Sequence, residues 1–305
     1  MSSPSATLIH FQCGPHHLAL PMSRVIRIDR DLTVDLHHKS DQPFGWTTFE
    51  THKIPVLDLG YCLGETPRSL DDPGQFLIIE HNGKQLGILA EKVIRARPAH
   101  TFHLRPLFPG LRQATRNLFE AVAAGEPPVF VLDTQGLAFL ANLTPLPQPV
   151  PNQRPRSLDM DPIASAQAAS AMLSFSLGKE KTRWGLSLAQ VSEIRQPEPL
   201  VPVAGSPNFL KGLLWWRKEP VPVVDLNLRQ GWPASDRPER VLVTKLGTGT
   251  GHLGFFCGSD LKIERDLTVY EPIPLSASRH GNLARGAFKG DQGTLVIPDL
   301  ETVFV

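Results

Sequence analysis

Short apolar runs separated by glycine and proline make up most of this chain. Stretches with the 3.6-residue period of an amphipathic helix are few. Many runs are apolar nearly throughout, which is typical of strands enclosed on both faces. Six runs are predicted to be strands: Leu8–Gln12, Phe76–Glu80, Val129–Leu132, Leu173–Leu177, Arg240–Lys245 and Thr294–Ile297. Short strands with close turns between them favour small β-barrels over an open parallel sheet.

Helical patterning is confined to short segments. We predict two short helices, at Ser187–Ile194 and at Leu111–Ala124. In the first, Val191 and Ile194 are three residues apart and would form the buried stripe of the helix, with Glu193 facing solvent. The fold class expected from these patterns is therefore mainly β, with short helices.

The apolar pattern occurs twice along the chain. Ile54–Leu59 reads IPVLDL and recurs as Val221–Leu226, VPVVDL, which places Asp225 167 positions after Asp58. Four further matches lie 166 or 167 positions apart: Val25 with Val191, Gly45 with Gly212, Gly87 with Gly254, and Asp133 with Asp299. Repeats in solenoid proteins are only about 20 to 50 residues long, so this longer period indicates a duplicated domain.

The repeat divides the chain into two domains and a linker. The first copy is expected at residues 7–143 and the second at 172–305, with a linker at 144–171. The linker begins with prolines at alternate positions and should be extended and semi-rigid there. Its last part, Ala164–Ala171, is rich in alanine and serine and is expected either to form a short helix or to stay flexible.

Composition and charge restrict the class of protein. With 41% hydrophobic and 20% charged residues, the 305-residue chain can bury real cores. Thirty-one basic residues against 30 acidic ones give a formal charge of +1, so no general basic field would attract nucleic acid or anionic membrane. No apolar run reaches the roughly 18 residues of a spanning helix, and direct membrane insertion is not expected. Three scattered cysteines and the absence of a secretory signal pattern favour a cytoplasmic protein.

The sequence shows no recognisable catalytic, cofactor or metal motif. There is no phosphate-binding loop or G-x-S-x-G motif, and Gly247–Gly251 lies between two strand patterns as a hairpin loop would. His10 and Cys13 have a spacing seen among metal ligands, but they would point to opposite faces of a strand. We therefore expect no catalytic residue, no metal and no cofactor.

Aspartates at the ends of apolar strands have a simpler interpretation. Asp58 and Asp225 each end the repeated apolar motif. An aspartate in that place usually caps the turn that follows, because its carboxylate accepts hydrogen bonds from the next backbone N–H groups. We predict this capping role for both residues rather than catalysis.

The second copy contains an ordered series of motifs. In chain order they are Leu173-x-Phe175-x-Leu177-Gly178, Leu186-x-Leu188-x-x-Val191-x-Glu193-Ile194, the loop Pro202–Gly212, Arg217, and Val221–Leu226. This series resembles the CheW-like domain family, and the resemblance extends over nearly all of the second copy and, more faintly, over the first. The resemblance implies two tandem CheW-like domains, each a pair of small SH3-like five-stranded β-barrels with short helices.

The same resemblance implies a function. CheW-like domains have no catalytic activity; they connect the cytoplasmic tips of methyl-accepting chemoreceptors to the regulatory domain of a CheA-type histidine kinase. The expected function is therefore a non-enzymatic adaptor in chemotaxis signal transduction. The alternative is a diverged CheW-like module that regulates another partner or senses a small molecule in the cleft between its barrels.

The resemblance also names candidate partner-binding residues. The positions that match partner-contact parts of the family motif are Val191, Glu193, Gly212 and Arg217, and two tryptophans, Trp215 and Trp216, precede the arginine. An arginine presents a planar fork of donors that fits a carboxylate or a pair of carbonyls, and tryptophan often carries interface energy. Glu193 is expected to orient Arg217 or to bind a cation of the partner. By strand alternation Trp216 is alternatively a core residue with Arg217 solvated outside it.

The two copies depart from the family in different ways. The family has glycine after the arginine, whereas Lys218 follows Arg217, and Trp215 replaces a polar residue. In the first copy Glu50, five positions after Gly45, occupies the place of Arg217 and reverses its charge. We expect the copies to have divided their contacts, with the second nearer the receptor role and the first chiefly docking or structural.

Overall fold

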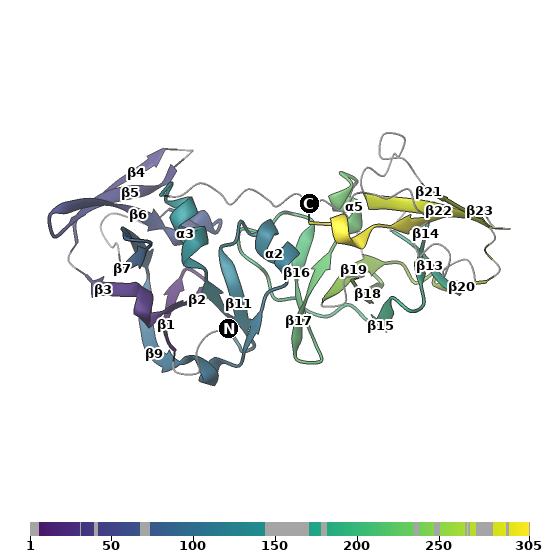
Figure 1. The fold of residues 1–305 in the computed structure, drawn as a ribbon, viewed down its shortest axis with the longest axis horizontal. Coiled ribbons are helices and arrows are strands. Elements are labelled where there is room, and N and C mark those ends of the chain that lie inside the picture. The colour runs from purple at the N-terminus through teal and green to yellow at the C-terminus, as the bar shows by residue number, and fades with distance from the viewer. Residues whose placement is uncertain are drawn as a thin grey trace. The chain divides into compact units, whose positions relative to one another are not determined.

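The structure is a computed structural model that describes residues 6–30, 32–39, 42–67, 74–143, 171–177, 182–234, 238–246, 251–265, 267, 269–272, 283–290 and 293–304. The predicted linker lies outside the described residues except for Ala171, and so does most of the Gly247–Gly251 loop. The chain divides into two compact units, one of residues 1–148 with 204–206 and the other of residues 149–203 and 207–305. The first unit is domain 1 and the second is domain 2 (Figure 1).

Domain 1 contains two six-stranded sheets. Sheet 1 has the order β10-β11-β12-β2-β1-β9, with bounds Leu104–Pro106, Phe119–Ala123, Val129–Leu132, His16–Pro21, Thr7–Cys13 and Lys92–Pro98. Sheet 2 has the order β3-β7-β8-β6-β5-β4, with bounds Val25–Asp29, Gln75–His81, Lys84–Ala90, His52–Asp58, Gln42–Phe49 and Val34–Lys39. The short helices of this domain are η1 Met22–Arg24, α1 Leu59–Cys62, η2 Ala99–Phe102, α2 Pro109–Ala114 and α3 Thr134–Leu140.

Domain 2 contains a six-stranded and a five-stranded sheet. Sheet 3 has the order β20-β13-β14-β23-β22-β21, with bounds Lys262–Glu264, Met172–Ser176, Arg183–Ser187, Gly293–Pro298, Ala284–Gly290 and Val269–Pro272. Sheet 4 has the order β15-β18-β19-β17-β16, with bounds Val191–Arg195, Arg240–Lys245, His252–Cys257, Glu219–Val224 and Leu210–Trp216. Among the described residues of this domain, the short helices are α5 Leu226–Arg229 and η5 Leu300–Thr302.

The two domains have the same topology. Sheet 3 repeats the strand order of sheet 1, including one parallel pair, β2 with β12 and β14 with β23. Sheet 4 repeats sheet 2, including the parallel pairs β6 with β8 and β17 with β19. In the described part of domain 2, β4 is represented only by an isolated bridge between Val201 and Leu213, at the place of one of the β4–β5 pairs. The predicted mainly β fold with two tandem domains is confirmed, although three sheets have one strand more than the five expected. All six predicted strands coincide with observed strands to within one residue at each end.

The predicted helices are corrected by the structure. Ser187–Ile194 is not a helix: Ser187 ends β14, the next three residues form a turn, and Val191 begins β15. Val191 pairs with Thr244 of β18, a partner some fifty positions away that a local pattern does not reveal. Of Leu111–Ala124 only the beginning is helical, in α2, and the rest contains β11.

The sheets contain buried apolar clusters of their own. In sheet 1 residues such as Leu8, Ala19 and Val131 form one buried cluster, and in sheet 4 another contains Leu214, Trp216, Val221, Val223, Val241 and Val243. The rings of Phe175 in sheet 3 and Phe255 in sheet 4 lie 5.2 Å apart between centroids, so the two sheets of domain 2 also share apolar contacts. Burial of these side chains is the main force that holds the small barrels together.

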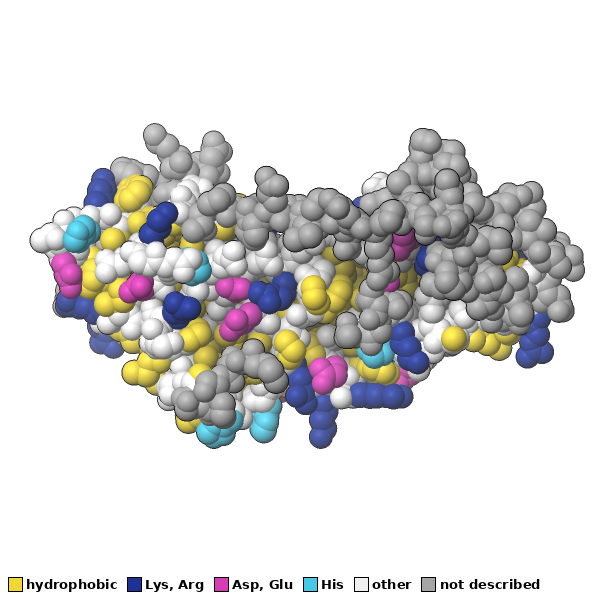
Figure 2. Space-filling view, viewed as in Figure 1, with side chains coloured by type: hydrophobic (Ala, Val, Ile, Leu, Met, Phe, Trp, Pro, Cys, Tyr) yellow, Lys and Arg dark blue, Asp and Glu magenta, His cyan; other side chains and the backbone are white. Residues whose placement is uncertain are grey.

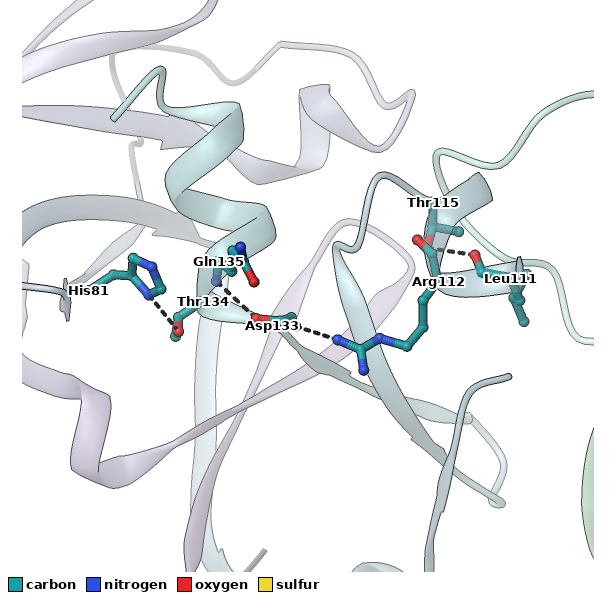
Figure 3. A network of polar contacts seen from close by, with 7 residues as sticks. All are labelled: His81, Leu111, Arg112, Thr115, Asp133, Thr134 and Gln135. Atoms are coloured by element: carbon teal, nitrogen blue, oxygen red, sulfur yellow. Dashed lines mark hydrogen bonds and ion pairs between the residues drawn. The ribbon is translucent and has the colours of Figure 1, made fainter. Parts of the chain in front are cut away.

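Four aspartates cap the turns after the apolar strands. Asp58 and Asp225 accept hydrogen bonds from backbone N–H groups at the starts of α1 and α5, as predicted. Asp299 does the same for η5. Asp133 caps α3 by accepting from the N–H of Gln135 at 2.9 Å, and its second oxygen accepts from Arg112 at 2.6 Å (Figure 3). The strand–aspartate–helix turn is therefore a repeated structural device in both domains.

A pair of histidines lies in domain 1 between neighbouring strands. Nε2 of His10 lies 3.0 Å from Nδ1 of His17, so one ring donates to the other. His10 is 8% exposed and its ring contacts Phe102. Burial, with the nearby charges of His17, Arg95 and Arg97, lowers the pKa of His10 to about 4. His10 is therefore neutral at pH 7 in the folded protein.

This histidine should make domain 1 sensitive to acid. Because the pKa of His10 is lower in the folded than in the unfolded chain, unfolding takes up a proton between pH 6.5 and about 4. The contribution of neutral His10 to the free energy of unfolding of domain 1 is thus fully present above pH 6.5. The free energy should fall by about 2 kcal/mol between pH 7 and pH 5. Urea titrations at both pH values, read by hydrogen exchange of β1 and β2, measure this. His10→Leu should remove the His10 part of the dependence; an unchanged dependence would contradict its assignment.

The capping role of Asp225 is tested by a pair of substitutions. Asp225→Ala removes the acceptor for the first N–H groups of α5 and should lower the free energy of unfolding of domain 2 by at least about 1 kcal/mol. Asp225→Asn keeps a capping oxygen and should lose clearly less, measured by urea unfolding. Equal losses in the two variants would show that capping is not what this side chain contributes.

Candidate partner-binding site

The hairpin between β16 and β17 presents the candidate arginine. Trp216 pairs with Glu219, which leaves Arg217 and Lys218 as a two-residue turn. Their φ angles are 49° and 66°, the left-handed values of a turn whose twist matches that of the strands. In the CheW-like family, which this sequence resembles, the second residue of this turn is glycine. Lys218 adopts that conformation at a cost of about 1 kcal/mol relative to glycine.

Gly212 has a structural role close to this hairpin. Its φ is 143°, and a Cβ atom there would lie 2.6 Å from the backbone oxygen of Val201. The neighbouring residue, Leu213, exchanges two backbone hydrogen bonds with Val201, at 2.8 and 2.9 Å. Glycine is therefore required for the loop after β15 to lie against β16.

Trp216 joins the two edges of sheet 4. β15 and β16 are the outermost strands of this sheet. The indole N–H of Trp216, on β16, donates to Oε2 of Glu193, on β15, at 2.7 Å. Trp216 is 5% exposed and its ring belongs to the core of the sheet. The tryptophan thus fills the barrel and connects its edges with one side chain.

Arg217 lies on the outside of the same ring. Its guanidinium carbon is 4.4 Å from the centroid of the Trp216 ring, a cation–π distance, while the residue itself is exposed. The His252 ring also lies 4.4 Å from the Trp216 ring, and burial together with Lys245 and Arg217 lowers the pKa of His252. The arginine is held in position by an aromatic surface, and its donors remain accessible to a partner.

The structure brings some of the predicted site residues together. Glu193, Trp216 and Arg217 form one contact series, in which Glu193 accepts from the indole N–H and Arg217 lies over the indole ring. Glu193 lies on a strand rather than on the predicted helix. Trp216 is a core residue and Arg217 is solvated, as the alternative interpretation expected, and both nevertheless belong to this series. Val191 and Trp215 are only half-buried and lie outside it.

Sequence reasoning did not identify two members of this region. His252 was missed, although it begins the strand that contains Leu253 and Gly254. Arg27 of domain 1 was also missed; it lies 166 positions before Glu193 and occupies the same place on β3. The repeat offset that linked Val25 to Val191 would have found it.

Domain 1 builds the equivalent region with reversed charges. Glu50, with a φ of 54°, is the first turn residue between β5 and β6, where domain 2 has Arg217. Phe49 replaces Trp216, and the guanidinium carbon of Arg27 lies 5.9 Å from its ring centroid. The reversal predicted at Glu50 is therefore accompanied by a second one at Arg27.

The described residues contain neither a metal-binding cluster nor a membrane-spanning helix. Among the residues that the structure describes, no group of three or more His, Cys, Asp and Glu side chains could hold a metal ion. His16 instead pairs with Glu65 at 3.0 Å. On the face drawn in Figure 2, basic and acidic side chains are interspersed over the described surface. No described helix is long and apolar enough to cross a membrane.

Comparison with known proteins identifies the fold family. The family model of the CheW-like domain matches twice, over residues 7–139 and 171–305. One similar solved structure is the scaffolding protein TtCheW from Thermoanaerobacter tengcongensis, with 20% sequence identity and a TM-score of 0.40. The match covers 45% of this chain and 88% of that one. The chain belongs to the CheW-like domain family, a family of non-enzymatic scaffolds, and carries two copies of its domain in tandem.

Proposed function

We propose that this chain is a cytoplasmic, non-enzymatic adaptor that couples chemoreceptors to a CheA-type histidine kinase through its CheW-like domains. The observation that supports this most directly is the hairpin tip of domain 2. There an exposed arginine, Arg217, is held against the buried ring of Trp216, at a position that matches the partner-contact part of the family motif. The partners are the regulatory domain of the kinase and the cytoplasmic tip of a methyl-accepting receptor.

The geometry of Arg217 suits recognition of a polar group on a protein. Its planar guanidinium offers several donors that fit a carboxylate or helix carbonyls. The Trp216 ring restricts the side chain before binding, so less conformational entropy is lost on association. Glu193 contributes by holding the ring through its indole N–H. Val191, Gly212 and Trp215 shape the surrounding surface in this proposal, and Arg217 makes the central contact.

Domain 1 has a different role in this proposal. Its turn carries Glu50 where domain 2 has Arg217, so it would repel an acidic partner group that domain 2 attracts. We assign the main receptor contact to domain 2 and a docking or structural role to domain 1. Each domain would then select its own partner surface by charge.

The charge reversal also favours a second candidate function. A tandem CheW-like protein whose first domain has reversed charges at two equivalent positions could regulate a partner outside a chemoreceptor array. Such a module would still bind protein through its hairpin surfaces. The two candidates differ in whether kinase and receptor are both bound.

Reversal of the charge at Arg217 tests the adaptor function. In a reconstituted system of receptor membranes, kinase and full-length chain, Arg217→Glu should weaken binding by at least about tenfold and abolish receptor-dependent kinase control. Binding is measured by co-sedimentation and control by kinase autophosphorylation. Lys262→Glu, the same charge change at an exposed position of sheet 3, is the matched control and should behave like the wild type. Wild-type control by Arg217→Glu, or no binding of kinase and receptor by the wild type, would contradict the proposal.

A further inference from the structure

Four basic side chains lie on one face of three neighbouring strands in sheet 1. His10 of β1 lies opposite Arg95 of β9, and Arg97 follows two positions later on β9. On the other side of β1, His17 of β2 is the diagonal neighbour of His10, and the two rings are hydrogen-bonded at 3.0 Å. Alternation of side chains along each strand puts all four on the same face. These four residues are called the basic face of domain 1.

The basic face has no acidic partner within the described residues. Neither Arg95 nor Arg97 forms an ion pair there, and the guanidinium carbon of Arg97 lies 5.8 Å from the ring centroid of Phe102. Burial lowers the pKa of His10, and the charged groups that lower it further, His17, Arg95 and Arg97, are all basic. The face therefore has a positive potential that no carboxylate neutralises.

Domain 2 fills the equivalent place with a neutralised network. On sheet 3, Arg183 pairs with Glu264, and Ser174 donates to the same carboxylate at 3.0 Å. Strand pairing aligns these three residues, in the same order, with His17, Arg97 and His10 of sheet 1. The carboxylate that neutralises the arginine in domain 2 thus has a third base as its counterpart in domain 1.

The histidine pair also presents a hydrogen-bond donor. Nδ1 of His10 is buried and makes no hydrogen bond in the described part of the chain. Buried N–H groups without an acceptor are rarer than buried acceptors without a donor, so we assign the proton of His10 to Nε2, which donates to Nδ1 of His17. His17 then carries its own proton on Nε2. His17 is half-buried, and this N–H has no acceptor among the described residues.

We propose that the basic face of domain 1 binds a phosphate group, either of inorganic phosphate or of a small phosphorylated molecule. Two arginine forks and the N–H of His17 suit the several oxygens of a phosphate, which carries roughly −1.5 to −2 charge at pH 7. A metal ion is disfavoured although two imidazoles meet there, because the nearby arginines repel a cation. The inference goes beyond the adaptor function, which uses the hairpin of domain 2 and needs no anion.

Titration of the full-length chain with inorganic phosphate tests the site. At pH 7 and constant ionic strength, the imidazole NMR signals of His10 and His17 should shift, with half-saturation at or below about 1 mM phosphate. Bound phosphate should also raise the pKa of His17, since an opposite charge favours the protonated ring. The absence of a saturable shift would overturn the proposal.

A second titration, with glycerol phosphate, distinguishes the two sources of the phosphate group. Tighter binding of the ester than of inorganic phosphate would identify a phosphorylated molecule as the ligand. Weaker binding of the ester would identify the free ion.

Charge reversals separate this site from a general effect of positive charge. Arg97→Glu places a carboxylate where domain 2 has Glu264, so it should weaken phosphate binding at least about tenfold. The control Arg30→Glu makes the same charge change at an exposed position after β3 and should bind phosphate like the wild type. Arg95→Gln, a milder change on the same face, should weaken binding at least about threefold.

Thermal unfolding gives a second readout and shows whether each variant is folded. Saturating phosphate should raise the Tm of the wild type and of Arg30→Glu but not that of Arg97→Glu, because only a bound ligand stabilises the folded state. Equal phosphate binding by the wild type and the Arg97→Glu and Arg95→Gln variants would overturn the proposal, and so would equal losses in Arg97→Glu and Arg30→Glu.

Discussion

The hydrogen bond between the indole of Trp216 and the carboxylate of Glu193 is the interaction on which the candidate site of domain 2 depends. A small twisted sheet can bury one face only if its edges approach each other, and this bond joins the two edge strands of sheet 4. The indole ring fills the barrel, its N–H needs an acceptor when buried, and its outer face holds Arg217. The core of the sheet, the contact between its edges and the candidate partner-binding arginine thus meet at one side chain.

Domain 1 has a different aromatic residue and a different charged residue at the equivalent positions of its barrel. Phe49 has no N–H, so a carboxylate beside it would have no donor to accept from, whereas the face of its ring attracts a cation. Arg27 at the position of Glu193 fits this exchange and lies over the ring. The inverted charge of the β3 edge is therefore linked to the replacement of one aromatic core residue by another. The aromatic residue in the barrel interior and the charge on its edge strand thus differ together between the two domains.

The parts of the site that could be predicted are those that depend on short stretches of sequence. The strands, the capping aspartates and the equivalence of Glu50 and Arg217 follow from local patterns and a fixed repeat offset. The helix predicted at Ser187–Ile194 was wrong because Val191 and Ile194 have a spacing that suits both a helix and a turn into a strand. Pairing with β18 decides between them, and that partner is distant in the sequence.

The sequence by itself determined the duplicated, mainly β domain and the family, because strand propensity, turn residues and motif order are properties of neighbouring positions. Only the tertiary structure decided that Glu193 accepts from Trp216, that His252 lies on the same ring and that Arg27, at the position equivalent to Glu193, lies over the ring of Phe49. These contacts join the first, last and middle strands of a sheet. Their formation depends on how the sheet closes, and closure is a property of all its strands together.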